Sequence, residues 1–215
     1  EIKREDTEIL QITRSGIDFC MKSGYYGTTV FSIPFIARYQ VMNAALALKT
    51  AEILNGELPL PSEAVEKGLR ETCWQGRMET VLPGVIVDGA HNEDGVEKFV
   101  ETAEHFQKEF PLTLLFSAVD DKDYTDMIRT ILGRISFRHI IVTQVGGYRK
   151  VPSGDLAEIF RREGCASVRA CDSVEEAFRE AVSQKGEDGL LFCVGSLYLV
   201  GEIKEILRRD KEERQ

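Results

Sequence analysis

The chain has 215 residues, of which 43% are hydrophobic and 29% charged, an ordinary composition for one or two soluble globular domains. Its net charge of −9 argues against nucleic-acid binding, because phosphate neutralisation requires a basic face. No apolar run approaches the roughly 20 residues of a membrane span, and no signal-peptide pattern is present. We therefore expect a cytoplasmic protein that contacts neither nucleic acid nor membrane.

The five cysteines support the same compartment. None forms a C-x-x-C pair and the three histidines are scattered, so the spacing predicts no metal site in this chain. Their odd number and mostly apolar surroundings are typical of reduced thiols in a cytosolic protein.

The first part of the chain predicts a small unit of three strands and two helices. Apolar and polar residues alternate over residues 9–13, 17–20 and 28–33, which indicates strands. Helices are expected over residues 35–54, closed by Asn55-Gly56, and from Ser62 as N-cap to about Glu71. So few elements can hardly close a core without more chain.

From residue 84 the pattern changes to short apolar stretches that alternate with amphipathic helices. The expected strands cover residues 85–87, 112–119, 139–143, 167–169 and 190–194. The expected helices cover residues 95–106, 124–132, 154–162, a segment opened by Ser173, and 197–209. This alternation predicts an α/β domain with a doubly wound, mostly parallel sheet covered by helices on both faces.

The boundary between the two units is expected near residue 75. Gly76 and the absence of a regular pattern from Cys73 to Thr80 predict a hinge linker over residues 76–80. Residues 1–75 and 81–215 would then form the two units.

A buried strand that ends in polar residues is the strongest functional signal. Residues 85–87 are apolar and lead directly into Asp88-Gly89-Ala90-His91-Asn92. In an open parallel sheet, ligands bind beyond the carboxyl ends of the strands. A helix N-cap would explain Asn92 or Asp94 alone. It does not explain Asp88, Gly89 and His91 together, so we expect a ligand site here.

Polar residues follow two further strands at the same edge of the predicted sheet. They are Asp120-Asp121-Lys122-Asp123 and Gly195-Ser196. Ser196 begins a helix, where backbone N–H groups and the helix dipole favour an anion, and Lys122 can hold a carboxylate or phosphate. An N-cap serine and an exposed acidic loop are the structural alternatives. The convergence of three strand ends on one edge favours a small anionic ligand.

Two residues at or before the boundary, Asn43 and Arg77, could have either a structural or a ligand-binding role. Asn43 interrupts an apolar helix, and a buried amide there must either satisfy neighbouring groups, which is slightly favoured, or bind a ligand. Arg77 could pair with Glu79 or reach a phosphate. The sequence contains neither G-x-x-x-x-G-K-[ST] nor G-x-G-x-x-G, so the main phosphate cradle for any nucleotide triphosphate would lie outside this chain.

Five motifs in order over residues 39–201 resemble one family. Asp88-Gly89-Ala90-His91-Asn92 resembles the D-G-A-H-N-P signature of folylpolyglutamate synthases and dihydrofolate synthases, which are relatives of the Mur ligases. The other four are Tyr39-Gln40-x-x-Asn43-Ala44-Ala45, Trp74-Gln75-Gly76-Arg77-Met78-Glu79, Asp121-Lys122-Asp123 and Gly195-Ser196-Leu197-Tyr198-Leu199-Val200-Gly201. Tyr39, Gln75 and Glu93 depart from the histidine and two prolines usual in the family.

The resemblance implies an ATP-dependent amide ligase that activates a carboxylate as an acyl phosphate and adds L-glutamate to folate or dihydropteroate. Residues 1–75 would end an α/β ATP-binding central domain. Residues 81–215 would form a Rossmann-like glutamate-ligase domain, the C-terminal domain of a Mur ligase. The phosphate loop, the Mg²⁺ ligands and most of the folate pocket would precede Glu1, so this chain alone is expected to be inactive and monomeric.

The resemblance also implies roles for six side chains. Asn43 would bind adenine, Arg77 the ATP phosphates, Asp88 the ribose hydroxyls, and His91, Lys122 and Ser196 the incoming glutamate, with His91 as the catalytic candidate. Two alternatives stay open: a Mur-type ligase of a peptidoglycan precursor, and a non-catalytic ligand-binding module of the same fold. The D-G-A-H-N and G-S-L-Y-L-V-G segments argue against the first.

Overall fold

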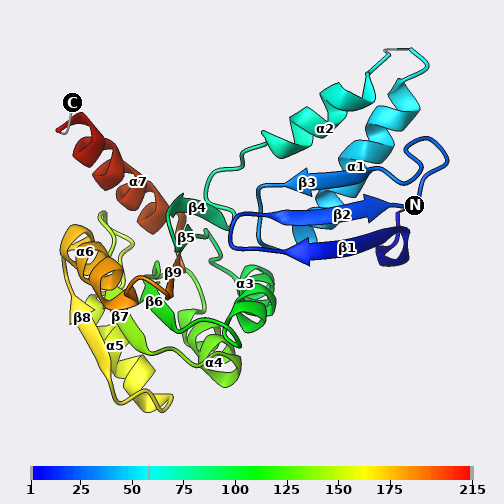
Figure 1. Ribbon diagram of the computed structural model, residues 1–215. Helices are drawn as coiled ribbons and strands as arrows, with labels where there is room; N and C mark the ends of the chain where they lie inside the picture. Colours follow the sequence, from blue (N-terminus) through cyan, green and yellow to red (C-terminus); the bar gives the residue numbers. More distant parts are fainter. Residues whose placement is uncertain (1, 58, 214–215) are drawn as a thin grey trace. The chain divides into compact units, whose positions relative to one another are not determined.

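The computed structural model describes residues 2–57 and 59–213, and the chain divides into two compact units, residues 1–75 and 76–215 (Figure 1). Each unit has an apolar core of its own. In the part of the chain that is described, no helix combines the length and the apolar character that a membrane span requires.

The first unit contains an antiparallel sheet of three strands. A short 3₁₀ turn, Arg4–Asp6, precedes β1 (Thr7–Ile12), β2 (Ile17–Met21) and β3 (Val30–Ile33), which pair in that order. Alternate residues of β2 face the core, and Phe19 lies opposite Phe31 with ring centroids 5.9 Å apart. The three expected strands are confirmed.

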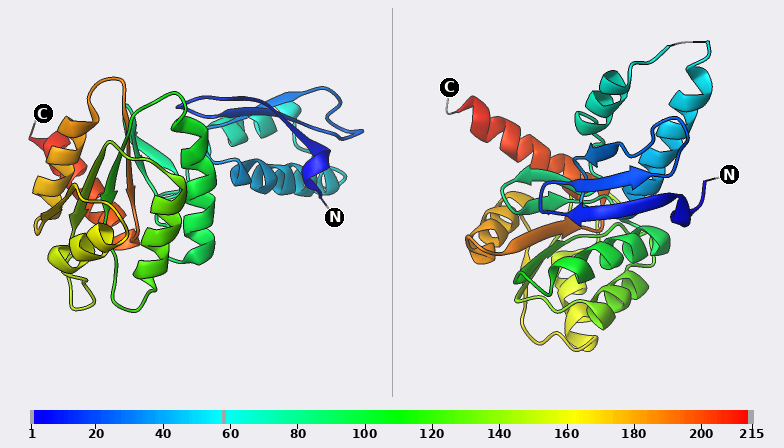
Figure 2. Two further views of the ribbon diagram at one scale, coloured as in Figure 1. Left: turned by 90° about the horizontal axis from the view of Figure 1, so that it is seen from below. Right: turned by 45° about the vertical axis from the view of Figure 1, so that its right-hand side comes forward.

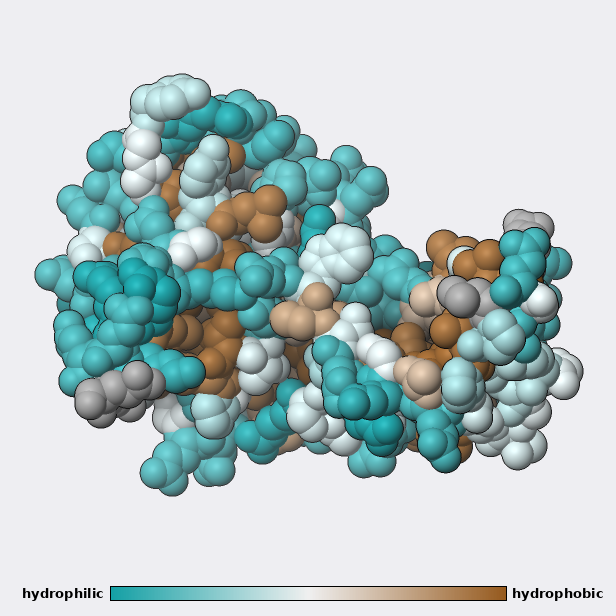
Figure 3. Space-filling model, turned by 90° about the horizontal axis from the view of Figure 1, so that it is seen from above, coloured by the Kyte–Doolittle hydropathy of each residue, from teal (hydrophilic) through white to brown (hydrophobic). Residues whose placement is uncertain are grey.

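Two helices, α1 (Tyr39–Leu54) and α2 (Ser62–Arg70), pack on this sheet. Helix α1 buries Val41, Ala44, Ala45 and Leu48, which share one face at helical spacing. Apolar side chains also reach the surface of the first unit, which appears as brown patches at the right of Figure 3. The exposed large apolar residues of the first unit are Leu10, Tyr25, Val30, Leu46, Ile53, Leu54 and Trp74.

Both helices begin differently from the prediction. Helix α1 starts at Tyr39 instead of residue 35, because Phe35, Ile36 and Ala37 fill the core in a non-helical segment after β3. The expected helix was too long because these three apolar residues look like its first turn in the sequence. In α2, Ser62 is the first helical residue and Pro61 occupies the N-cap position.

The second unit is built on a six-stranded sheet with the order β4-β5-β9-β6-β7-β8. Its strands are β4 (Glu79–Leu82), β5 (Val85–Val87), β6 (Leu112–Phe116), β7 (His139–Thr143), β8 (Val168–Cys171) and β9 (Leu190–Val194). All neighbours are parallel except the antiparallel pair β4–β5. The helices are α3 (Glu93–Phe106), α4 (Tyr124–Arg134), α5 (Ser153–Arg162), α6 (Val174–Lys185) and α7 (Leu197–Glu212).

Helices cover both faces of this sheet (Figure 2), which confirms the predicted doubly wound α/β fold. Helices α6 and α7 share an apolar cluster with one face of β5, β9, β6 and β7. On the other face, Phe192 contacts Phe99 of α3 and Phe116 contacts Phe160 of α5, with ring centroids 5.4 and 5.6 Å apart. The central strands β5, β9 and β6 are therefore buried on both sides, as their uninterrupted apolar sequences require.

The segment predicted as a hinge linker, residues 76–80, is more regular than expected. Glu79 and Thr80 belong to β4, an edge strand whose short sequence shows no clear alternation. The Gly76 N–H donates to Glu79 Oε2 at 2.8 Å, and the Gly76 carbonyl accepts from the Gly89 N–H at 2.7 Å. The chain is thus held within the second unit from Gly76 onward, and the irregular residues 72–75 connect the two units.

We predict that chymotrypsin cleaves this connector first, after Trp74, whose side chain is 68% exposed in an irregular segment. A stable fragment that begins at Gln75 should accumulate, as mass spectrometry would show. The comparison site is Tyr148, which is 94% exposed, although the adjacent loop is tied by the Gly146 N–H to Glu202. First cleavage after Tyr148, or an unchanged pattern in Trp74→Ala, would contradict this prediction.

Candidate functional site

The carboxylate of Asp88 lies where β5 ends, and it is only 3% exposed. Its backbone N–H continues the sheet by donating to the Cys193 carbonyl at 2.9 Å. Its Oδ2 accepts the Met78 N–H at 2.8 Å and its Oδ1 accepts the Ala90 N–H at 2.7 Å. The side chain therefore joins the segment before β4 to the loop after β5.

Burial raises the pKa of Asp88 from 3.8 to about 6, because removal of water disfavours the charged carboxylate. The two backbone N–H groups act in the opposite direction, as do the charges of Arg77 and His91. Desolvation exceeds these favourable contacts, so the pKa of this carboxyl group is raised despite its two hydrogen bonds.

The next residues are fixed by close packing and by a helix cap. A Cβ on Gly89 would lie 2.2 Å from Leu197 Cδ2, so any larger residue here would displace the Leu197 side chain. His91 is half-buried, and its Nδ1 lies 2.6 Å from the Gly89 carbonyl. A carbonyl only accepts, so Nδ1 donates this hydrogen bond to Gly89, and Nε2 takes no part in the contact. Asn92 caps α3 by accepting the Gly95 N–H at 2.9 Å.

The loop after β6 contains a cluster of charged side chains. Lys122 Nζ lies 3.6 Å from Asp121 Oδ2, and its side chain is 34% exposed. Arg149, from the loop after β7, also pairs with Asp121, and this guanidinium holds the pKa of the Asp121 carboxyl below its ordinary value. Asp123 caps α4 through the Asp126 N–H. Two cations thus share one carboxylate at this position.

The loop after β9 presents the beginning of α7. Gly195 has a φ of 106°, and a Cβ there would lie 2.0 Å from the Ser117 carbonyl oxygen. Ser196 is 1% exposed, and its Oγ caps α7 by accepting the Tyr198 N–H at 3.1 Å. Ser196 therefore has the N-cap role that the sequence analysis gave as the structural alternative. The N-terminus of this 16-residue helix also favours a nearby anion.

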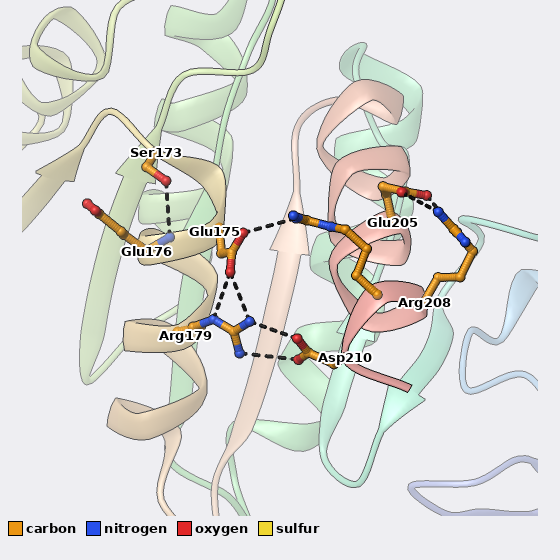
Figure 4. Close-up of polar contacts among 8 residues, drawn as sticks. Ser173, Glu175, Glu176, Arg179, Glu205, Arg208 and Asp210 are labelled. Atoms are coloured by element: carbon orange, nitrogen blue, oxygen red, sulfur yellow. Dashed lines mark hydrogen bonds and ion pairs between the residues drawn. The ribbon is translucent and has the colours of Figure 1, made fainter. Parts of the chain in front are cut away.

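Near its C-terminal end, helix α7 is tied to α6 by ion pairs (Figure 4). Glu175 accepts from both Arg179 and Arg209, and Arg179 donates two hydrogen bonds to Asp210 at 2.8 and 3.2 Å. Exposed ion pairs are individually weak, but a connected set restrains the relative rotation of two helices. The first turn of α7 is therefore presented by a braced helix.

Five of the six predicted side chains lie in the second unit at one edge of its sheet. Strands β5, β9 and β6 are consecutive neighbours, so the loops that carry Asp88, His91, Ser196 and Lys122 leave the sheet side by side. Arg77 precedes β4, in the segment that Asp88 holds. The expectation that three strand ends converge is confirmed.

The sixth residue, Asn43, belongs to the first unit and is exposed on α1, where its Nδ2 donates to Gln40 Oε1 at 2.8 Å. The expectation of a buried amide was wrong. Asn43 lies off the helix face that Val41, Ala44 and Leu48 bury against the sheet. An exposed amide carries no desolvation penalty, so a structural reason for the asparagine is weaker than the sequence suggested.

Arg77 lies in the turn directly before β4. Its side chain is half-buried, and it forms no ion pair with the described residues of the second unit. A guanidinium without a carboxylate partner keeps its planar donors for an anion. Within the described ranges, no group of three or more His, Cys, Asp or Glu side chains is placed to hold a metal ion.

The family description "Mur ligase, glutamate ligase domain" matches residues 76–197, more than half of the chain and most of the second unit. The chain belongs to the Mur ligase family. The resemblance seen in the sequence motifs is thereby confirmed.

Curated and solved relatives place the chain near the folate branch of this family. A Bacillus subtilis dihydrofolate synthase/folylpolyglutamate synthase is 32% identical over 181 residues, which are 80% of this chain and 40% of that protein. The folylpolyglutamate synthase of Thermotoga maritima superimposes with a TM-score of 0.74 at 26% identity, covering 94% of this chain and 46% of that one. The Mycobacterium tuberculosis folylpolyglutamate synthase complexed with ADP superimposes with a TM-score of 0.72 at 25% identity, covering 94% of this chain and 48% of that one. This chain thus spans less than half the length of each relative.

Three charged residues of the site were not predicted. Arg149 follows a glycine pair after β7, and its place beyond a strand end was the signal that could have identified it. Glu79 was considered only as a partner for Arg77, whereas it pairs with Lys204 of α7 at 2.7 Å. Lys204 is the third of these residues. It is 125 positions away from Glu79 in sequence, so no local pattern could have paired the two.

We predict that Gly195→Ala lowers the free energy of unfolding by roughly 2–5 kcal/mol, because it combines a strained φ with overlap against a backbone oxygen. Gly201→Ala is the matched control in α7, where a Cβ meets nothing within 4 Å. That change should be neutral or stabilising by up to about 1 kcal/mol, since alanine favours helix. Denaturant unfolding measures both, and equal effects would contradict the close approach at Gly195.

We also predict a pH-dependent contribution to stability from Asp88. Its folded pKa of about 6 exceeds the ordinary 3.8, so the folded chain binds this proton more tightly. The stabilisation is full below about pH 4 and is lost as pH rises through 6, a change on the order of 2–3 kcal/mol. The difference in unfolding free energy between the natural protein and Asp88→Asn should follow this curve. Asp121→Asn should alter the profile in the opposite sense, since the pKa of Asp121 is lowered.

Proposed function

We propose that this chain provides the glutamate-ligase part of an ATP-dependent ligase that joins L-glutamate to a folate. The main observation in its favour is the position of the family's motif residues. They lie in the loops after β5, β9 and β6, which leave neighbouring strands at one edge of the sheet. Membership of the Mur ligase family and the folate-branch relatives support the reaction class. The folate carboxylate would be activated as an acyl phosphate, and the glutamate amine would displace phosphate to form the amide.

For the nucleotide, the proposal assigns three side chains. Arg77 would bind the phosphates, a role supported by its planar donors and by the absence of an ion pair with described residues of the second unit. Asn43 would bind the adenine, a role that its exposed amide permits. Asp88 would accept from the ribose hydroxyls. Each of its oxygens already accepts one N–H, and a carboxylate has further lone pairs to accept more.

For glutamate, the proposal assigns His91, Lys122 and Ser196. A carboxylate of the amino acid would lie at the N-terminus of α7, where the backbone dipole favours negative charge. Lys122 adds a point charge on the neighbouring loop, and the Nε2 of His91 would form a hydrogen bond with the amino acid. These residues would orient the amine toward the acyl group, and orientation supplies much of the rate in such transfers. His91 is the catalytic candidate among them.

ATP would act with Mg²⁺, whose ligands would come from outside this chain. The protein would act as a cytoplasmic monomer, and the choice between folate and dihydropteroate depends on a pocket to which none of the six side chains is assigned.

Ligand binding by this chain tests the proposal directly. We predict that Ser196→Ala and His91→Ala each raise the Kd for L-glutamate roughly ten- to a hundredfold, the effect of losing one hydrogen bond to a charged ligand. Their Kd for ADP should stay close to that of the natural protein. Asp88→Ala should raise the Kd for ADP and leave the Kd for L-glutamate close to that of the natural protein. Titrations followed by NMR or calorimetry measure both ligands.

Ser173→Ala is the matched control, because Ser173 caps α6 through the Glu176 N–H as Ser196 caps α7. It should lower stability by about 1 kcal/mol and leave the Kd for glutamate unchanged. Absence of ADP and glutamate binding in the natural protein would contradict the proposed function. If the natural protein binds ADP or glutamate but none of the three variants changes either Kd, a non-catalytic ligand-binding module of the same fold would be favoured.

A further inference from the structure

The turn that carries Arg77 has an unusual backbone. Gly76 has a φ of 68°, and Met78 has a φ of 46°, the one positive value for a non-glycine residue among those described. A side chain in this conformation costs on the order of 1 kcal/mol or more, so the surrounding structure must hold it. Met78 is 1% exposed, and its N–H is fixed by Asp88. The turn is thus supported from the β5 side.

A second support comes from Glu79 and Lys204. Glu79 Oε2 accepts the Gly76 N–H at 2.8 Å, which closes the turn across three residues. The same carboxylate receives Lys204 Nζ at 2.7 and 3.0 Å. The side chains of Glu79 and Lys204 are 19% and 30% exposed, so solvent screens this pair less than a fully exposed one.

Lys204 comes from α7, whose position is restrained by the ion pairs to α6 that Figure 4 shows. The helix that presents Ser196 at its first turn therefore also reaches the turn before β4. Arg77 lies between the residue held by Glu79 and the residue held by Asp88. With both neighbours fixed, the backbone of Arg77 has one orientation from which its side chain extends.

We propose that Glu79 and Lys204 are positioning residues that hold the turn Gly76–Glu79 so that Arg77 is presented to the phosphate groups of a nucleotide. The proposal rests on the nucleotide-binding role given to Arg77 above. The bracing of the turn is a property of this chain that can be measured without any ligand.

The test compares Glu79→Ala, Glu79→Gln and Lys204→Met by amide hydrogen exchange and by titration with ADP. Glu79→Ala removes both contacts, and the Gly76 amide should exchange roughly tenfold faster. Glu79→Gln keeps an acceptor for that amide, so exchange should rise less. The Ala90 amide, which donates to the other oxygen of Asp88, serves as the internal reference and should be unaffected.

The Kd for ADP should increase in the same order, by roughly three- to tenfold in Glu79→Ala and less in Glu79→Gln, while Arg77→Ala sets the upper limit. Arg208→Met is the matched control for Lys204→Met, because its partners Glu205 and Glu212 both lie on α7. It should change neither the Gly76 exchange rate nor the Kd for ADP.

Two outcomes would overturn the positioning role alone. One is an unchanged Gly76 exchange rate in Glu79→Ala. The other is faster exchange with a Kd for ADP equal to that of the natural protein. If the natural protein itself binds no ADP, the proposed function fails, and the nucleotide role of the turn fails with it. Should Glu79→Ala not fold, Glu79→Gln and Lys204→Met give the same comparison.

Discussion

A single buried carboxylate, Asp88, holds together the parts of the second unit on which the candidate site depends. Its two oxygens accept N–H groups from residues on either side of the β4–β5 hairpin. Without those bonds, two backbone donors and a charged group would be buried without partners, which is far more unfavourable than an exposed defect. Local geometry at Met78 and at the loop before His91 is therefore linked through one side chain.

Local electrostatics at the site differ from the charge of the whole chain. A net charge of −9 excludes a broad basic surface, yet cations and a helix N-terminus gather at one sheet edge. Lys122 and Arg149 share Asp121 there, so a carboxylate already occupies the position between them. An incoming anion would compete with a tethered side chain, and such competition makes binding sensitive to the geometry of the ligand.

The sequence predicted the second unit well because its pattern is strong. Uninterrupted apolar strands and amphipathic helices leave few alternatives, and local rules alone identify Ser173 as a cap and narrow the cap of α3 to Asn92 or Asp94. Strand β4 was missed, since four residues of mixed character at a sheet edge carry little periodic signal. The exposure of Asn43 and the pairing of Glu79 with Lys204 depend on tertiary placement, which no local pattern contains.

The order of the strands has a consequence for how the chain folds during synthesis. Strand β9 pairs with β5 on one side and β6 on the other, but it comes after all the other strands of its sheet. Until it leaves the ribosome, β4–β5 and β6–β7–β8 are separate sheets with unpaired inner edges. Such edges are prone to mispairing, and the long-range contacts that close them form slowly. A nascent chain of this protein should therefore depend on its last strand, and on chaperones until that strand is available.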